Sequence, residues 1–146
     1  MAKTNNKEET LSLAKEYLGK VRKSKGDCAS VILLEGNLGS GKTTFTQGLA
    51  QALGVHEPVT SPTFIIEKIY KLENDPDFNH LIHIDAYRLE SSDEAKHLGI
   101  TELFNDPKNL IVLEWPEKIK EALPLFAKKI SFTFISENER EITYHG

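Results

Sequence analysis

The segment 36–43 limits the fold more than any other part of the chain. It reads Gly-Asn-Leu-Gly-Ser-Gly-Lys-Thr, in which two glycines with four residues between them precede a lysine and a hydroxyl residue. This is the pattern of a phosphate-binding loop, which joins a buried strand to a helix. An apolar run, 29–35, precedes the loop. Phe45, Leu49 and Leu53 follow it at the spacing of one helical face, so we expect a strand, loop and helix unit.

Each residue type in this loop has a physical role in holding phosphate. Glycines let the backbone turn tightly and bring its N–H groups against phosphate oxygens, while the following helix directs its positive end at the anion. Lys42 can reach the β- and γ-phosphates, and the Thr43 hydroxyl can bind Mg²⁺. The predicted nucleotide contacts are Gly36, Asn37, Leu38, Gly39, Ser40, Gly41, Lys42, Thr43 and Thr44.

Two carboxylates lie at the ends of apolar runs. Glu114 closes the run 110–114, and Asp85 lies near the end of another. A phosphate loop needs an acidic residue at the end of a neighbouring strand to hold Mg²⁺ or its waters. We predict Thr43 and Glu114 as magnesium ligands, and Lys42, Asp85 and Glu114 as catalytic residues, with Asp85 also beside the nucleotide. Asp85 can instead be a turn residue or a partner of Arg88, and either carboxylate can position the attacking water.

Other polar residues are weaker candidates. Thr60, Ser61 and Thr63 occupy a segment that can sense the γ-phosphate in phosphate-loop proteins, although an ordinary polar loop is the alternative. His83 can orient a phosphate or a water, or it can be a structural histidine. We also assign Thr10 and the loop around Asn138 to the adenine base, because the motifs above leave that end of the nucleotide unassigned.

The rest of the chain predicts an α/β protein with antiparallel additions. Turn residues separate the strand pair 64–71 and 81–87, and again the pair 130–135 and 141–144, so each pair should form a hairpin. Helical patterns or capping signals occur at 7–22, 91–98 and 117–123. We expect one P-loop NTPase-like domain over residues 1–146, whose sheet is sandwiched between helices.

Composition restricts the environment and the partners. The longest strictly aliphatic run, 31–34, is far too short to cross a membrane, and the segment 1–10 has no apolar stretch for secretion. Cys28 is the single cysteine, so no internal disulfide can form. We therefore expect a cytoplasmic protein without a membrane partner. The net charge of −4 disfavours direct, strong nucleic-acid binding, because neutralisation of phosphates supplies most of that affinity.

Four motifs, in order and at their intervals, resemble those of the TsaE family, also called YjeE. They are GNLGSGKTTFTQGLA, VTSPTF, HIDAYRL and LEWPE. The resemblance begins at Glu8 and runs through Glu117, and it is weaker in the terminal hairpin. Asn37 and Ser40 depart from the family pattern, which often has an acidic residue and alanine there. By resemblance, Thr43 and Glu114 would bind magnesium, Asp85 would lie beside the nucleotide, and residues 60–63 would form a mobile switch.

The resemblance also implies a function. TsaE proteins are ATPases required for threonylcarbamoyladenosine formation next to the anticodon of tRNA. They bind the transferase complex of TsaD and TsaB and hydrolyse ATP, which permits repeated turnover. ATP and Mg²⁺ would thus be the cofactors. The chain would interact with tRNA only indirectly, through the complex. Hydrolysis by the isolated chain should be slow, because a partner often completes the water-activating site.

Two other classes use the same loop. A small-molecule kinase needs a lid with basic residues, but the chain has only Arg22, Arg88 and Arg140, and no arginine-rich insertion follows Glu114. A GTP switch needs an Asn-Lys-x-Asp pattern after the loop, and none occurs. The kinase is therefore the main alternative.

Overall fold

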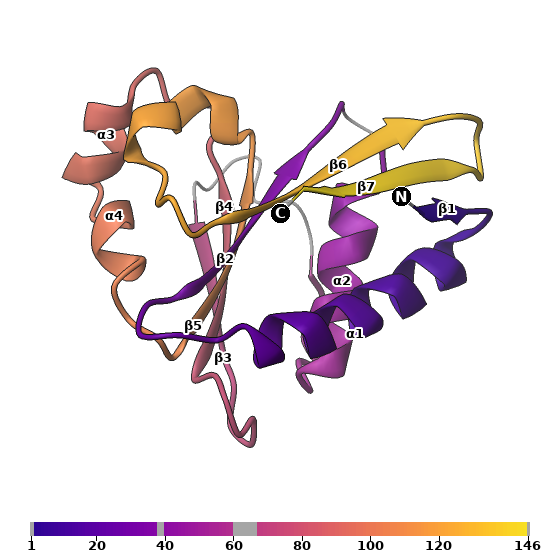
Figure 1. Cartoon of the computed structure of the whole chain (residues 1–146), viewed down its shortest axis with the longest axis horizontal. Coiled ribbons are helices and arrows are strands. Elements are labelled where there is room, and N and C mark those ends of the chain that lie inside the picture. The colour runs from indigo at the N-terminus through magenta and orange to yellow at the C-terminus, as the bar shows by residue number, and fades with distance from the viewer. Residues whose placement is uncertain (1, 38–39, 60–66, 146) are drawn as a thin grey trace.

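The computed structural model describes residues 2–37, 40–59 and 67–145. In these ranges a seven-stranded sheet has the order β1-β7-β6-β2-β5-β4-β3 (Figure 1). The strands are β1 (Ala2–Thr4), β2 (Ser30–Glu35), β3 (Glu67–Lys71), β4 (His80–Asp85), β5 (Asn109–Glu114), β6 (Lys128–Phe134) and β7 (Arg140–His145). The helices are α1 (Lys7–Lys23), α2 (Lys42–Ala52), α3 (Ser92–His97), α4 (Ile100–Leu103) and the 3-10 helix η1 (Pro116–Ala122).

The centre of the sheet is parallel and its two edges are antiparallel. Strand β2 pairs in parallel with β5 and β6, and β4 pairs in parallel with β5. Strands β3 and β4 form one hairpin, and β6 and β7 form the other. Both expected hairpins are confirmed, as is the α/β class with a sheet between helices.

Two apolar cores separate the helices into layers. Helices α1 and α2 pack on one face of the sheet, with Leu18, Phe45 and Leu49 in their core. Helices α3, α4 and η1 cover the other face, with Ala95, Ile100 and Ile119 in the second core (Figure 1). Both faces of the central strands are therefore buried, which explains their continuous apolar sequences.

Helix α1 and helix α2 approach closely because a glycine lies between them. A Cβ atom built on Gly48 would lie 2.7 Å from Ala14 Cβ and 2.8 Å from the Leu11 carbonyl oxygen. Only a residue without a side chain fits there. This contact fixes α2, and with it the phosphate loop at the start of α2, against the first helix.

Three elements differ from the expected pattern. Strand β1 was not predicted, because three residues are too short to show a period, and it pairs antiparallel with β7. The helix expected at 91–98 is α3, but α4 follows it directly after Gly99. The helix predicted at 117–123 is a 3-10 helix that begins at Pro116, with non-helical backbone angles at Ile119.

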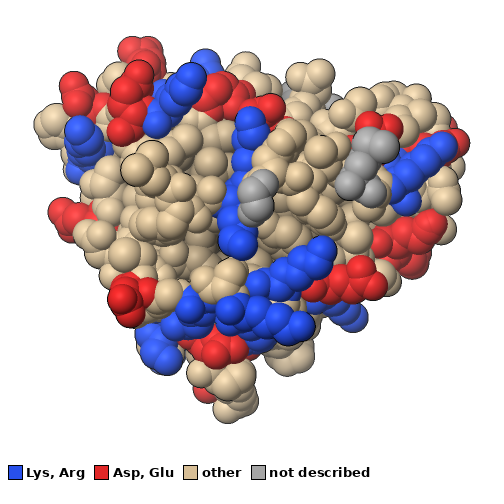
Figure 2. All heavy atoms as spheres, in the orientation of Figure 1, with Lys and Arg blue, Asp and Glu red and all other residues tan. Residues whose placement is uncertain are grey.

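Charged side chains of both signs lie on the face drawn in Figure 2, and basic ones gather over the C-terminal part of α1. Arg22 in that part of α1 is not simply solvated. It donates two hydrogen bonds to Asp75, at 2.6 and 2.9 Å, and one to Asp77 at 2.6 Å. The ion pairs tie α1 to the β3–β4 turn.

Among the helices of the described ranges, none has both the length and the apolar character that a membrane crossing requires.

We expect Asp75→Ala to lower the free energy of unfolding by about 1–3 kcal/mol at neutral pH, because it removes charge-assisted hydrogen bonds from a buried carboxylate. Burial alone would raise the pKa of Asp75, but hydrogen bonds from Arg22 and from the backbone N–H groups of Asp77 and Phe78 lower it below 3.8. The contribution should therefore disappear as the pH falls through this lowered pKa. Urea unfolding across this range checks the effect, with exposed Asp27→Ala as control; equal stability of both variants would contradict it.

Candidate functional site

Strand alternation places three polar side chains on the same face of the sheet as α2. Leu81 on β4 and Leu110 and Val112 on β5 belong to the core beneath α1 and α2. Residues two apart on a strand share a face, so His83 and Glu114 also point toward that face. Asp85 pairs in register with Glu114 on the neighbouring strand. The C-terminal ends of β4 and β5 thus bring His83, Asp85 and Glu114 together.

Lys42 reaches this group from the first residue of α2. Its Nζ atom donates a hydrogen bond to the Gly36 carbonyl oxygen at 2.5 Å and lies 3.8 Å from Glu114 Oε1. It also lies 4.5 Å from the centre of the Trp115 ring. The loop lysine and the strand-end carboxylate are therefore neighbours, although 72 positions of sequence separate them (114 − 42).

A histidine holds the other side of the same carboxylate. His83 Nε2 and Glu114 Oε2 are 2.5 Å apart. The group is almost closed to solvent, with exposed fractions of 0% for His83, 3% for Glu114, 4% for Lys42 and 7% for Asp85. Charged groups are rarely buried to this extent without partners, so the cluster is a candidate active site.

Asp85 has a structural role as well as a place in the cluster. Burial raises the pKa of its carboxyl group, and the nearby Glu114 carboxylate adds to the rise. The backbone N–H of Tyr87, which donates to Asp85 Oδ1 at 2.9 Å, opposes this shift. The alternative of a turn residue is thus supported by a hydrogen bond, while the position beside Glu114 leaves the predicted nucleotide role open.

The described part of the loop can accept a phosphate group. Gly36 has a φ of 149°, and a Cβ atom on it would lie 2.6 Å from the Phe132 carbonyl oxygen, so only glycine fits. Gly41, with a φ of 103°, directly precedes α2. The buried Ser40 Oγ has no hydrogen-bond partner among the described residues. A glycine cradle, an unpaired hydroxyl and the N-terminus of a helix together suit an anion.

The donor set also fits a magnesium ion held partly by nucleotide. Mg²⁺ prefers oxygen ligands and commonly binds through one or two protein groups plus substrate phosphates. Thr43 and Glu114 supply a hydroxyl and a carboxylate of this kind. In the ranges that the structure describes, no group of three or more His, Cys, Asp and Glu side chains could hold a metal ion.

Thr10, which was assigned to the base, lies near the start of α2. Together with Thr44, Asn138 and Arg140 it lines a cavity of about 130 Å³. Thr10 is buried, and its hydroxyl donates to Thr4 Oγ1 at 2.9 Å. The structure therefore brings the two segments assigned to adenine to one cavity beside the loop.

The family of the chain follows from comparison with known proteins. Residues 4–142 match the family model described as threonylcarbamoyl adenosine biosynthesis protein TsaE. The chain belongs to the TsaE family. It is 42% identical over 142 residues to the tRNA threonylcarbamoyladenosine biosynthesis protein TsaE of Bacillus subtilis, which covers 97% of this chain and 82% of that protein. The TsaE protein of Aquifex aeolicus is 34% identical over 139 residues, or 94% of this chain and 89% of its own.

A solved structure supports the same assignment at the level of the fold. The crystal structure of YdiB from Bacillus subtilis aligns with a TM-score of 0.73 and 34% identity, covering 98% of this chain and 82% of that one. The expected resemblance to the TsaE family is thus confirmed.

Several predicted residues of this TsaE chain lie outside the described residues. They are the loop residues Leu38 and Gly39 and the switch residues Thr60, Ser61 and Thr63. Their roles stay predictions.

Two residues near the site, Trp115 and Arg140, were not among the predicted site residues. Trp115 has a positive φ of 59°, which is strained for a bulky residue, and its ring lies 5.0 Å from that of Tyr87. Trp115 lines a cavity of about 690 Å³ next to Gly36. Arg140 donates to the carbonyl oxygens of Ser136, Glu137 and Glu139 and so holds the β6–β7 turn beside the loop. The position of Arg140 after a turn of polar residues did not indicate that it would bind the turn carbonyls.

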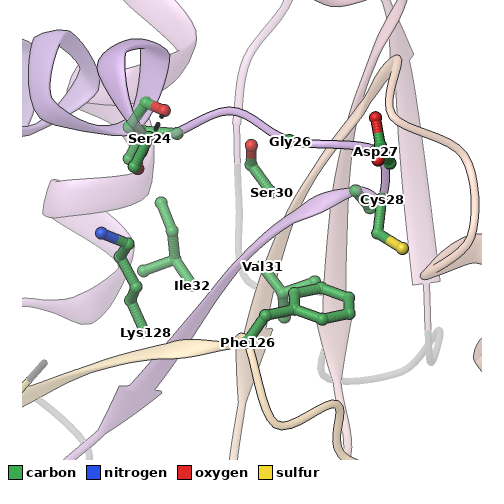
Figure 3. A pocket seen from close by; sticks show the side chains of 11 residues that line it. Ser24, Gly26, Asp27, Cys28, Ser30, Val31, Ile32, Phe126 and Lys128 are labelled. Carbon is green, nitrogen blue, oxygen red and sulfur yellow. Dashed lines mark hydrogen bonds between the residues drawn. The ribbon is translucent and has the colours of Figure 1, made fainter.

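A further cavity lies far from the loop, at the start of β2. It has a volume of about 210 Å³, and Figure 3 shows Cys28, Val31 and Phe126 lining it. Strand β2 runs from this cavity toward the loop, so the two sites occupy opposite ends of one strand. Cys28 is a free thiol that lies just before β2.

Proposed function

We propose that this TsaE-family chain binds and hydrolyses ATP with Mg²⁺ in support of tRNA N6-threonylcarbamoyladenosine formation. One observation carries the proposal: the loop lysine, Lys42, lies against the strand-end carboxylate, Glu114, in a buried cluster at the N-terminus of α2. Phosphate-loop ATPases place a lysine and an acidic residue at this position. The family assignment supplies the pathway, and the site supports the reaction.

The residues of the site have different roles in the proposed reaction. The loop backbone and Lys42 bind the phosphates, and the Lys42 ammonium offsets the charge that develops on the γ-phosphate. Thr43 and Glu114 would hold Mg²⁺, which polarises the phosphoryl oxygens when it is bound. Asp85 or Glu114 accepts a hydrogen bond from the attacking water and orients it. Thr10 and Asn138 would contact the base.

We also propose that the transferase complex of TsaD and TsaB is the partner of this chain in the cytoplasm. The proposal follows from the family, and the charge of the chain supports it. A net charge of −4 suits a subunit whose partners hold the tRNA. The alternative, a small-molecule kinase, has no support from the TsaE relatives. No feature of the described site favours a kinase over an ATPase.

Addition of the TsaD–TsaB complex should raise phosphate release from ATP above the low rate of the isolated chain. If residues 60–63 close over the γ-phosphate only when a partner holds them, the isolated chain is mostly open. Thr60→Ala or Thr63→Ala should then reduce the stimulation more than the affinity for ATP. Phosphate release is measured with ATP and with GTP, with and without the complex and small-molecule acceptors.

Three outcomes separate the classes. Stimulation by the complex with ATP supports the proposal. Transfer of the γ-phosphate to an acceptor would support the kinase instead. A rate that is maximal for the isolated chain, and indifferent to the complex and to both threonine variants, would overturn the accessory role.

A further inference from the structure

His83 is a buried histidine whose ring forms a hydrogen bond with Glu114. It lies within β4 at 0% exposure, between the strand neighbours Ile82 and Ile84. Its Nε2 atom lies 2.5 Å from Glu114 Oε2. Its Nδ1 atom has no hydrogen-bond partner among the described residues. A carboxylate only accepts hydrogen bonds, so Nε2 is the donor when Glu114 is ionised.

An apolar residue would serve the core better at this position. Burial of an unpaired ring nitrogen destabilises a fold, and the nearest strand neighbours of His83 in β4, Ile82 and Ile84, are buried aliphatic residues. The histidine therefore needs a reason other than packing. Its contact with Glu114 supplies one.

The two oxygens of Glu114 have different neighbours. His83 Nε2 lies against Oε2, while Oε1 faces Lys42 Nζ at 3.8 Å, a distance too long for a hydrogen bond. His83 thus holds one oxygen and leaves the other turned toward the phosphate loop. Carboxylates that bind metals are commonly held in this way, and loss of such a partner typically costs 10–100-fold in metal affinity or activity.

We propose that His83 is a positioning residue, which fixes the carboxylate of Glu114 so that Oε1 stays turned toward the phosphate loop, where it would bind Mg²⁺ together with the nucleotide. The inference rests on the proposed ATPase function and deepens it. In this proposal His83 acts through Glu114 and does not bind phosphate itself. It should therefore affect the magnesium dependence of the site and leave magnesium-free ATP binding unchanged.

Trp115 provides a binding readout that does not depend on activity. It is the single tryptophan of the chain, and its ring lies 4.5 Å from Lys42 Nζ. Its fluorescence is titrated with ATP, first without Mg²⁺ and then at rising Mg²⁺ concentration. The variants are His83→Leu, which removes the donor, and His83→Gln, which keeps an N–H donor. His80→Gln on the same strand is the control, since its side chain lies at the opposite end of β4.

The expected result is specific to the contact with Glu114. His83→Leu should raise the Mg²⁺ concentration at half-saturation by about 10-fold, with unchanged ATP affinity in the absence of Mg²⁺. His83→Gln should restore most of the magnesium response, and His80→Gln should match wild type. In a Glu114→Gln background, His83→Leu should have no further effect, because the partner through which it acts has lost its charge.

Several results would overturn the inference. An unchanged Mg²⁺ response in His83→Leu, an equal loss of ATP affinity with and without Mg²⁺, or an undiminished effect in the Glu114→Gln background would each do so. If His83→Leu does not fold, His83→Gln and His83→Asn replace it; the shorter asparagine should fail where glutamine succeeds, and equal behaviour would contradict the proposal. If wild type binds no ATP, the proposed function fails together with this inference. If wild type and Glu114→Gln behave as expected and His83→Leu matches wild type, only the role of His83 fails.

Discussion

Replacement of Lys42 with alanine should lower ATP hydrolysis by at least about 100-fold and leave the protein folded. The lysine is the one described cation that contacts both the loop, at the Gly36 carbonyl, and the Glu114 carboxylate. In the proposed site it is pre-organised for the γ-phosphate, and loss of one such donor costs about 10²–10³ in rate. Phosphate release at saturating ATP measures the effect.

The fold should survive this change because Lys42 belongs to neither apolar core. Thermal unfolding of the variant should show one cooperative transition. Lys15→Ala is the matched control, since Lys15 is an exposed lysine of α1. Equal rates of phosphate release for Lys42→Ala and wild type would contradict the assignment of Lys42 to the active site.

Glu114→Gln should have an effect of similar size by a different route. The substitution keeps the volume and a hydrogen-bond acceptor for His83 but removes the charge that would attract Mg²⁺. We expect ATP to bind still, while hydrolysis falls by at least about 100-fold and added Mg²⁺ helps less. Magnesium titrations of hydrolysis compare the variant with wild type and with Glu102→Gln, an exposed glutamate on α4. Superimposable curves for Glu114→Gln and wild type would contradict the assigned role.

The sequence predicts most of the fold because its strongest signals are local. The loop 36–43 dictates a strand before it and a helix after it, and the turn residues 74–77 mark the β3–β4 hairpin that the structure confirms. Apolar runs that end in Asp85 and Glu114 identify two strand ends. Parallel pairing then brings both carboxylates to one edge, which is why the sequence could predict that the two acidic members of the candidate site lie together.

The missed features depend on contacts between distant segments. Strand β1 exists through its pairing with β7, and a three-residue strand has no period of its own. The contact of His83 with Glu114 spans 31 positions and needs the register of β4 against β5. Arg22 likewise contacts Asp75 across 53 positions. The sequence alone is compatible with either a functional or a structural role for His83. The structure adds that its ring contacts the Glu114 carboxylate.

The most direct test of the central claim is the amount of threonylcarbamoyladenosine formed in tRNA by a reconstituted reaction. The reaction contains TsaD, TsaB, tRNA, ATP, Mg²⁺ and the threonylcarbamoyl adenylate intermediate. With the wild-type chain, product should exceed the amount of transferase present, because ATP hydrolysis permits repeated turnover. With Lys42→Ala, or without this chain, product should stop near one equivalent of transferase. Equal product in all three reactions would contradict the account.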